Sequence, residues 1–480
     1  MMDLVPDVTN TTSLSLSSSL CPGVRQREVV SLHVGQTGVR VGDSLWRHLT
    51  QQHLPPRSDP TPRDAMFSDA MFSDAMFSDA MFRETSGGEH VARCVFTDLE
   101  RGEVEEVKRG GHIYSADSFI ADWQDSASNY ARGHYSIGRG LADRTVEGVR
   151  REVEKCESVQ GILTTHSLGG GTGAGYTSLL HWRLRDMFRS KVAVDFALFP
   201  SPQVSPIIVE PYNSILYLNS ELLYCDNLTV MLENESLYKL CSKLEQIELP
   251  CYPDINNVIS RIISSFTAPV RHPGSHSVDL ATIQTNIVPY SRLRFVSANL
   301  TTSGNSSSIA DMTTASFSTE YSTLDLDMPK GKLLSACLLY RGLVTAGEVN
   351  TALHKLSSLR TLKTCDWVPC PFKVGILNQP HLTDPLATSL CTLTNHTGLE
   401  TTFDRLNRKF DKLYQRRAFL HWFHGEGMES DEFACAREEV AALEQDYSYE
   451  NNPPSFDFDR YRYKGEDSED SEDESQDTNK

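Results

Sequence analysis

The stretch His166–Gly175, HSLGGGTGAG, decides the fold of this chain. Five of its last seven residues are glycine, so backbone amides can close around an oxygen-rich anion without obstruction from side chains. An apolar strand, Gly161–Thr165, precedes the stretch, and an amphipathic helix that begins at Tyr176 follows it. A strand, a glycine turn and a helix N-terminus direct free N–H groups and the positive end of a dipole at one point. The stretch therefore predicts a phosphate-binding loop, with a glycine-rich surface turn as the alternative.

A second unit of this kind lies closer to the N-terminus. Val29–Val34 is a short apolar strand, Gly35-Gln36-Thr37-Gly38 is a turn, and Val39–Leu49 has helical spacing. Further strands are expected at Val91–Leu99 and Val192–Phe199. Strands and helices that alternate over roughly 200 residues predict an α/β fold with a mostly parallel, doubly wound sheet. Ligands of such sheets lie at the C-terminal ends of the strands, so both turns should face one ligand.

Length and composition are typical of a multidomain globular protein. The chain has 480 residues, of which 39% are hydrophobic and 23% charged. Its net charge of -19 argues against nonspecific binding to nucleic acid and favours basic partners or divalent cations. The eleven cysteines are scattered, which predicts reduced thiols. No stretch has the character of a secretory signal or of a membrane span, so we expect a cytoplasmic protein.

The sequence pattern divides the chain into six segments. They are a disordered extension (1–26), a nucleotide-binding domain (27–253), a central helix (254–271), an intermediate α/β domain (272–400), a C-terminal region of antiparallel helices (401–449) and an acidic disordered tail (450–480). Two amphipathic helices are expected near the end, at Leu399–His421 and Glu429–Tyr447, and a mobile loop at Leu300–Ser308.

An Asp-Ala-Met-Phe motif is repeated with serine spacers from Asp64 to Phe82. Its period of five matches neither a helix nor a strand, so no single face collects the Met and Phe side chains. We interpret it as tandem slippage in a tolerant loop, and a Met/Phe docking segment is the alternative.

Polar residues follow several of the expected strands. Asp98 and Glu100 stand at a strand end, where carboxylates can hold a magnesium ion directly or through water. The polar loop DSASNYARG begins at Asp125 and leads into a helix, and Glu210 precedes a proline at the start of another.

These motifs together resemble tubulin, most closely its α type. The resemblance covers about Arg27 to Tyr447, and the GGGTGAG loop is specific to the superfamily of tubulin and the bacterial division GTPases. The C-terminal helices distinguish the chain from the bacterial branch, and the absence of Lys-Ser or Lys-Thr after the last glycine distinguishes it from Walker-type loops. Further matching segments are Arg27-Glu28, His33–Gln36, Tyr130–Tyr135, Glu210–Asn213, Arg417–Trp422 and Gly425–Met428.

The resemblance implies a GTP site with Mg²⁺. Gln36 and Glu100 would serve the metal, Glu210 would accept from the ribose hydroxyls, and Asn234 and Asn256 would read the guanine edge while Tyr252 stacks on its face. For Tyr252 and Asn256 alone, ordinary packing and helix capping are the alternative. The implied nucleotide contacts are Gly35, Gln36, Thr37, Asp98, Glu100, Asp125, Ser128, Asn129, Ser167, Gly169, Gly170, Gly171, Thr172, Gly173, Ser205, Glu210, Asn234, Tyr252 and Asn256.

Two departures from the family pattern concern the nucleotide. Ser128 replaces the usual asparagine near the phosphates, so we expect weaker binding. Thr282 stands where an α-type chain has a glutamate that activates water against the next subunit's GTP. A hydroxyl is no general base near neutral pH, so that hydrolysis should fall on the order of 100-fold or more. Asp279, one helical turn earlier, remains as the candidate to position water.

Three functions follow as hypotheses. The first is a divergent α-like subunit that pairs with β-tubulin in microtubules, joins other dimers in a polymer, and binds motors and microtubule-associated proteins through its acidic tail. The second is a regulatory or capping relative that dimerises, assembles poorly and fails to activate its neighbour. The third is an independent GTPase, whose turnover should be slow because the family's water-activating group comes from another subunit.

Overall fold

The computed structural model describes most of the chain between Arg27 and Asn451. Ser205, the repeat as far as Asp79, the N-terminal extension and the tail from 452 onward lie outside the described residues. The described ranges are 27–53, 80–85, 87, 89–110, 113–201, 207–272, 277–303, 308–358, 362–379 and 388–451.

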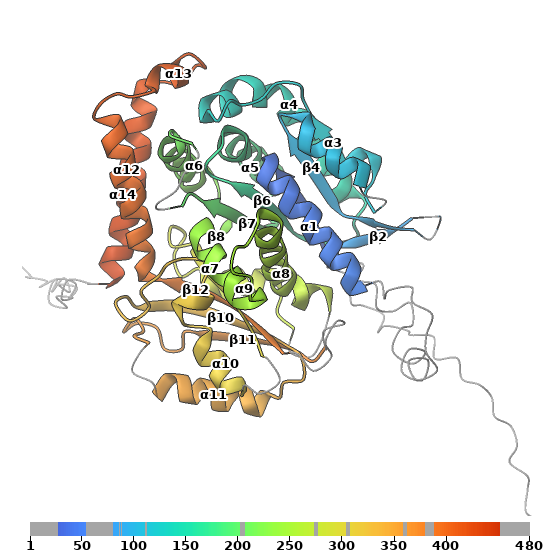
Figure 1. Ribbon diagram of the computed structural model, residues 1–480, viewed down its shortest axis with the longest axis vertical. Coiled ribbons are helices and arrows are strands. Elements are labelled where there is room, and N and C mark those ends of the chain that lie inside the picture. The colour runs from blue at the N-terminus through green and yellow to red at the C-terminus, as the bar shows by residue number, and fades with distance from the viewer. Residues whose placement is uncertain are drawn as a thin grey trace, which may run out of the picture.

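A single ten-stranded sheet runs through the molecule in the order β11-β10-β12-β9-β8-β7-β6-β1-β4-β5 (Figure 1). Neighbouring strands are parallel except that β12 runs antiparallel to both β9 and β10. The mostly parallel α/β sheet predicted from the sequence is thereby confirmed. The strands are β1 (Glu28–Val34), β4 (Cys94–Asp98), β5 (Phe119–Ala121), β6 (Val159–Ser167), β7 (Val192–Phe199), β8 (Leu228–Glu233), β9 (Phe295–Thr302), β10 (Leu333–Arg341), β11 (Phe372–Leu377) and β12 (Ser389–His396).

The sheet joins two parts of the chain that the sequence pattern separates. β8 pairs with β9 in parallel, with Thr229 opposite Phe295 and Met231 opposite Ser297. The backbone hydrogen bonds of the N-terminal strands therefore continue directly into the strands of the intermediate region.

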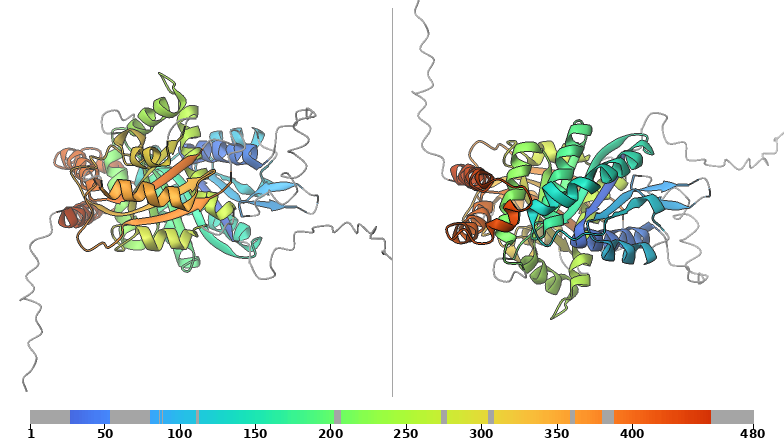
Figure 2. Two further views of the ribbon diagram at one scale, coloured as in Figure 1. Left: turned by 90° about the horizontal axis from the view of Figure 1, so that it is seen from below. Right: turned by 90° about the horizontal axis from the view of Figure 1, so that it is seen from above.

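Helices cover both faces of the sheet (Figure 2). On one face, α1 packs with α8 in a core that contains Trp46, Ile259 and Phe266, and on the other α4 and α5 bury Leu141 and Leu180. The helices are α1 (Gly35–His53), α3 (Arg101–Gly110), α4 (Ile137–Glu154), α5 (Thr177–Met187), α6 (Glu210–Tyr224), α7 (Asn234–Glu245), α8 (Tyr252–Arg271), α9 (Leu280–Ile287), α10 (Ile309–Ala315), α11 (Ala346–Ser358), α12 (Glu400–Tyr414), α13 (Leu420–His424) and α14 (Ser430–Asn451).

The expected central helix is α8. Its apolar residues recur every three or four positions, and Ile255, Val258, Ile259, Ile262 and Phe266 are all buried. This spacing gives one continuous apolar face, which packs along α1.

The expected strand Val91–Leu99 is wrong in one respect, because it is broken at Arg93. β3 (His90–Ala92) pairs with β2 (Phe82–Glu84) in a separate hairpin, whereas β4 pairs with β1. Arg93 lies between them, buried, and its guanidinium donates to the Phe82 carbonyl and to Glu28.

The expectation of two C-terminal helices is also wrong, since the described chain forms three. Arg417 and Phe419 adopt positive φ values of 49° and 62° and end the helical path between α12 and α13. α12 and α14 lie side by side along one flank of the molecule (Figure 1). α14 continues to Asn451, into the segment assigned to the tail.

The predicted loop Leu300–Ser308 is likewise partly wrong. Leu300, Thr301 and Thr302 belong to β9 and pair with β12. Residues 304–307 lie outside the described part of the chain.

Candidate nucleotide-binding site

The glycine turns after β1 and β6 meet at one end of the sheet. β1 and β6 are neighbours, and the chain leaves them in opposite directions, toward β4 from β1 and toward β7 from β6. This is the topological switch point at which open α/β sheets bind ligands. A Cβ added to Gly35, whose φ is +72°, would lie 3.4 Å from the Gly173 amide nitrogen. Two helix N-termini therefore converge, an arrangement that favours the binding of an anion.

The glycine loop continues into a π-helical turn, Thr172–Tyr176, which packs against a second π-helical turn, Arg132–Ser136. Glycines make this approach possible. A Cβ on Gly171 would overlap the Asn129 carbonyl and lie 2.6 Å from the Asn129 amide nitrogen. The Thr172 hydroxyl donates to Ser126 Oγ at 3.0 Å. The structure therefore brings the DSASNYARG segment, with Ser128 and Asn129, directly against the loop.

Asn213 joins these parts, although no role of its own was expected for it from the sequence. Its amide nitrogen donates to the carbonyls of Ser128 at 2.8 Å and Gly169 at 2.9 Å, and its oxygen accepts from the Tyr130 amide at 3.1 Å. Asn213 is fully buried on α6. Glu210, Ser214 and Glu221 are also buried on α6, so a polar residue at an inward position of this helix is no signal specific to Asn213.

Glu210 lies at the N-terminus of α6 and touches the glycine loop. A Cβ on Gly169 would overlap the Glu210 carboxylate and lie 3.1 Å from its Cγ. The Gly169 amide is 3.4 Å from Ser167 Oγ. Glu210 and Ser167 therefore both lie at the rim of the loop.

Asp98 ends β4 in a buried position beside Glu100 and Asp125. Burial raises its pKa to about 7, with the carboxylates of Glu100 and Asp125 adding to the effect and the amides of Leu99 and Glu100 opposing it. The described residues contain no cluster of three or more His, Cys, Asp or Glu side chains arranged to hold a metal ion. Mg²⁺ would fit here only with phosphate oxygens and water in most of its six positions, the mode usual for this ion.

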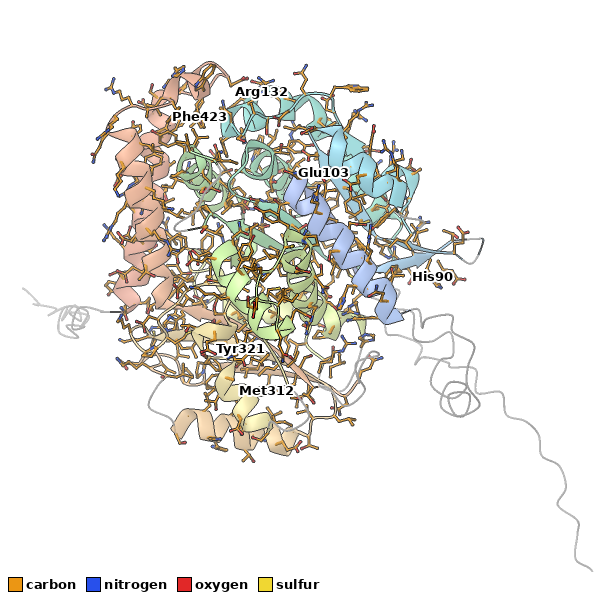
Figure 3. The ribbon with its side chains drawn as sticks, in the orientation of Figure 1. His90, Glu103, Arg132, Met312, Tyr321 and Phe423 are labelled. Atoms are coloured by element: carbon orange, nitrogen blue, oxygen red, sulfur yellow. The ribbon has the colours of Figure 1, made fainter. Side chains whose placement is uncertain are left out.

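Gln36 stands at the start of α1, directly after Gly35. Its side-chain amide donates to Glu103 Oε1 at 2.9 Å, and Arg40 also bonds Glu103, which lies beside α1 (Figure 3). To reach a metal or a phosphate, the Gln36 amide would have to leave this acceptor.

The three residues predicted to hold the guanine base lie on two neighbouring helices. Asn234 is the first residue of α7, and Tyr252 is the first residue of α8 with Asn256 one turn later. Tyr252 is 68% exposed, so its ring is available for stacking. Thr37 and Ile259, one turn beyond Asn256, line one small cavity. The N-terminal part of α8 is thereby next to the Gly35 turn.

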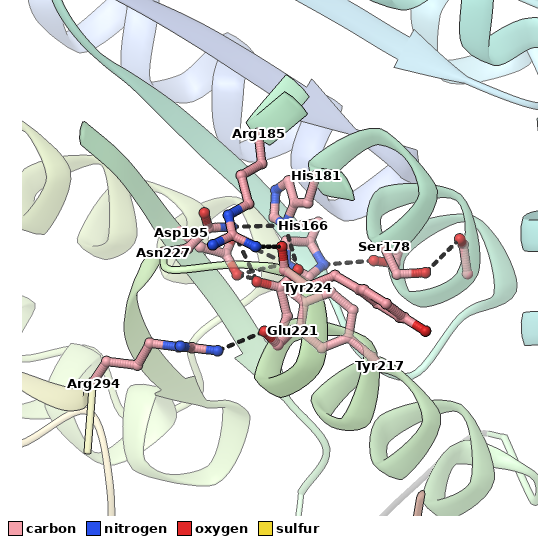
Figure 4. Close-up of polar contacts among 12 residues, drawn as sticks. His166, Ser178, His181, Arg185, Asp195, Tyr217, Glu221, Tyr224, Asn227 and Arg294 are labelled. Carbon is pink, nitrogen blue, oxygen red and sulfur yellow. Dashed lines mark hydrogen bonds and ion pairs between the residues drawn. The ribbon is translucent and has the colours of Figure 1, made fainter. Parts of the chain in front are cut away.

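A buried polar network lies behind the glycine loop (Figure 4). His166 Nδ1 is 2.5 Å from the Gly173 carbonyl, its Nε2 is 3.0 Å from Asp195, and the Tyr217 hydroxyl donates to Asp195 at 2.6 Å. Burial alone would raise the pKa of Asp195, but His166 and Tyr217 outweigh it, so this pKa lies below its ordinary value. The sequence analysis missed Asp195, although one carboxylate inside the apolar strand VAVDFALF is a recognisable signal.

Asp279 and Thr282 lie away from this site. Both belong to the start of α9, which packs at the N-terminal ends of β6 and β7, where a Cβ on Gly161 would be 3.3 Å from Leu280. The Asp279 carboxylate forms an ion pair with Arg27. The chain therefore does not bring these two residues to its own glycine loop.

Comparisons with known proteins agree with this geometry. The model of the Tubulin/FtsZ family, GTPase domain, matches residues 28–242, and that of the tubulin C-terminal domain matches residues 290–408. Tubulin alpha-2 chain of Caenorhabditis elegans is 38% identical over 438 residues, covering 88% of this chain and 96% of the relative. Tubulin alpha chain, nucleomorph, of Guillardia theta is 39% identical over 437 residues, with the same two coverages.

The fold and the two glycine turns thus define a GTPase-domain protein of the Tubulin/FtsZ class. The relatives narrow this further. The chain belongs to the tubulin family, as a divergent α-tubulin-like member. The family relationship implies GTP binding. No helix of the described ranges is both long and apolar enough to cross a bilayer.

Proposed function

We propose that this chain is a GTP-binding structural subunit of microtubules that pairs with a β-type tubulin. The observation that carries the proposal is the convergence of Gly35 and Gly173 at the switch point, with two helix N-termini directed at one place. The close α-type relatives support the same role.

In this proposal the predicted residues contact the nucleotide and its metal ion. Gly169–Gly173 cradle the phosphates through backbone amides, and Glu210 at the loop's rim accepts from the ribose. Asp98 and Glu100 order the water shell of Mg²⁺, while Tyr252, Asn234 and Asn256 hold the base. The acidic tail offers a binding surface to motors and associated proteins, and the protein acts in the cytoplasmic cytoskeleton.

The first experiment measures bound nucleotide. The full chain is co-expressed with β-tubulin, purified, denatured and extracted, and guanine nucleotide is quantified per chain. Two guanine nucleotides per heterodimer are expected. Only the nucleotide of the β chain, in a folded heterodimer, would contradict the proposal.

A second function rests on Thr282. In place of the expected glutamate, α9 presents a hydroxyl that cannot act as a general base, and the neighbouring Asp279 is engaged by Arg27. This favours a chain that joins a heterodimer or caps an end and leaves its neighbour's GTP intact. Hydrolysis of the GTP on that neighbour would then depend on a water-activating group from another subunit.

Co-sedimentation with assembling microtubules separates the two functions. A lattice subunit should enter the pellet in proportion to its share of the total tubulin and label polymers along their length. A capping protein should stay substoichiometric and label ends only. Fluorescence imaging of the same polymers gives the distribution directly.

A further inference from the structure

Two adjoining cavities lie at the opposite end of β6 and β7 from the glycine loop. The strands place this end about 20 Å from the predicted nucleotide site, at 3.3 Å per residue. The inner cavity, of about 240 Å³, is lined by residues that include Ile162, His181, Arg185, Phe188, Lys191 and Asn227. The outer one, of about 390 Å³, is lined by Trp182, Arg185, Asp186, Arg189, Tyr224 and Asp226.

His181 gives the inner cavity a buried polar group. Its Nδ1 is 2.6 Å from Glu221 Oε1, and Asn227 donates to the other Glu221 oxygen at 3.0 Å (Figure 4). Burial alone would lower the pKa of His181, but Glu221 and Asp195 outweigh it and raise the pKa above its ordinary value. The Nε2 atom is buried and has no hydrogen-bond partner in the described part of the chain. A buried polar atom of this kind normally has a partner.

Basic side chains surround the same space. Arg185 bonds the Tyr224 carbonyl and Asp226, which uses two of the five N–H donors of a guanidinium. Arg189 pairs with Asp186, and Lys191 forms no ion pair with any described residue. Three basic groups thus stand against two carboxylates at these cavities, in a chain whose net charge is -19.

Two aromatic side chains stand at the outer cavity. Trp182 on α5 is 52% exposed and Tyr224 on α6 is 50% exposed, whereas the other two tyrosines of α6, Tyr212 and Tyr217, are buried. Aromatic faces beside cationic groups are suited to a planar ligand that carries negative charge.

We propose that these cavities bind a small organic acid, a planar molecule with a carboxylate or phosphate group. Lys191 and Arg185 hold the acidic group, and Trp182 and Tyr224 contact the ring. The site is separate from the glycine loop and independent of the proposed GTP-binding role.

Saturation-transfer NMR on the full chain tests this with three probes: phenyl phosphate, benzoate and neutral phenol. Both acids should bind, and phenol should bind at least tenfold more weakly, because a charge-assisted hydrogen bond is lost. Arg185→Gln combined with Lys191→Gln should raise the Kd of the acids by on the order of tenfold or more. The matched control is Arg183→Gln on the same helix, whose side chain pairs with Asp143 and does not line either cavity.

The proposal would be overturned if phenol bound as tightly as the two acids, or if the double variant kept the affinity of the unmodified chain. It would also be overturned if neither acid bound. Ala193→Trp supplies a second check, since Ala193 lines the inner cavity and an indole there fills it. If Ala193→Trp leaves the midpoint of thermal unfolding unchanged, this variant should no longer bind phenyl phosphate or benzoate. The guanine nucleotide content of each variant, measured after denaturing extraction, reports separately on the glycine loop.

Discussion

Gly171 lies so close to Asn129 that a Cβ on the glycine would stand 2.6 Å from the Asn129 amide nitrogen. The obstacle is backbone, which cannot rotate away as a side chain can. The phosphate loop and the DSASNYARG segment are therefore held at a separation that only glycine permits.

Gly171→Ala should destabilise the loop, whereas Gly170→Ala should not, because a Cβ on Gly170 meets nothing within 4 Å. We expect a loss of about 1–3 kcal/mol for Gly171→Ala, typical of overpacking. Thermal unfolding of the nucleotide-free proteins measures the difference. If nucleotide occupies the open space beside Gly170, Gly170→Ala lowers GTP content at unchanged stability. Equal losses of stability in the two variants would contradict the packing argument.

Asp98 should make the nucleotide-free protein less stable as pH rises. Its pKa is about 7 when folded and close to 3.8 when unfolded, so between about pH 4 and pH 7 the folded chain keeps a proton that the unfolded chain releases. Stability therefore declines across that window. Asp98→Asn should flatten the decline, measured as the unfolding midpoint against pH, while Asp117→Asn on an exposed turn should leave it in place.

Asp195→Ala should be strongly destabilising. Asp195 and His166 are both fully buried, and removal of one partner leaves the other without its charge or hydrogen bond. The expected cost is about 3–5 kcal/mol. Asp143→Ala, which breaks an exposed pair with Arg183, should cost less than about 1 kcal/mol. Denaturant unfolding compares them, and similar costs would argue against an ion pair behind the loop.

Ser128→Asn should strengthen nucleotide retention. Ser128 has a φ of 54°, in the left-handed region that asparagine tolerates better, and it lies beside the glycine loop. Ala127→Asn is the matched control, since Ala127 has a φ of 48° and is exposed. Both variants should gain a few tenths to about 1 kcal/mol of stability. Only Ser128→Asn should slow GTP dissociation, measured by displacement of a labelled nucleotide.

Thr282→Glu should accelerate GTP hydrolysis on the adjoining β subunit, because it supplies the carboxylate missing from α9. The gain should be on the order of 100-fold or more, the usual effect of a general base. Thr285→Glu adds the same charge one turn further on, at an exposed position, and should have little effect. Phosphate release from mixed polymers measures both. Identical rates for Thr282→Glu and the unmodified chain would show that Thr282 does not limit GTP hydrolysis on the adjoining β subunit.

The sequence by itself determined the class of fold and the two glycine turns that meet at one end of the sheet. Strands such as Val29–Val34 end in glycine turns that are followed by helices. These are local patterns, and few arrangements of strands in a sheet are compatible with them. The family resemblance supplied the base and ribose residues. Where these residues lie depends on how α6, α7 and α8 pack, which no local sequence pattern determines.

Only the tertiary structure decided the rest. The pairing of β8 with β9, the hub at Asn213 and the His166–Asp195–Tyr217 network join residues far apart in sequence, and hydrogen bonds of that kind leave no periodic signal. The break at Arg93 arose because its backbone lies between two different strand partners. The replacement at Thr282 was visible in the sequence. Only the fold shows that Thr282 lies at the end of β6 and β7 opposite the chain's own glycine loop.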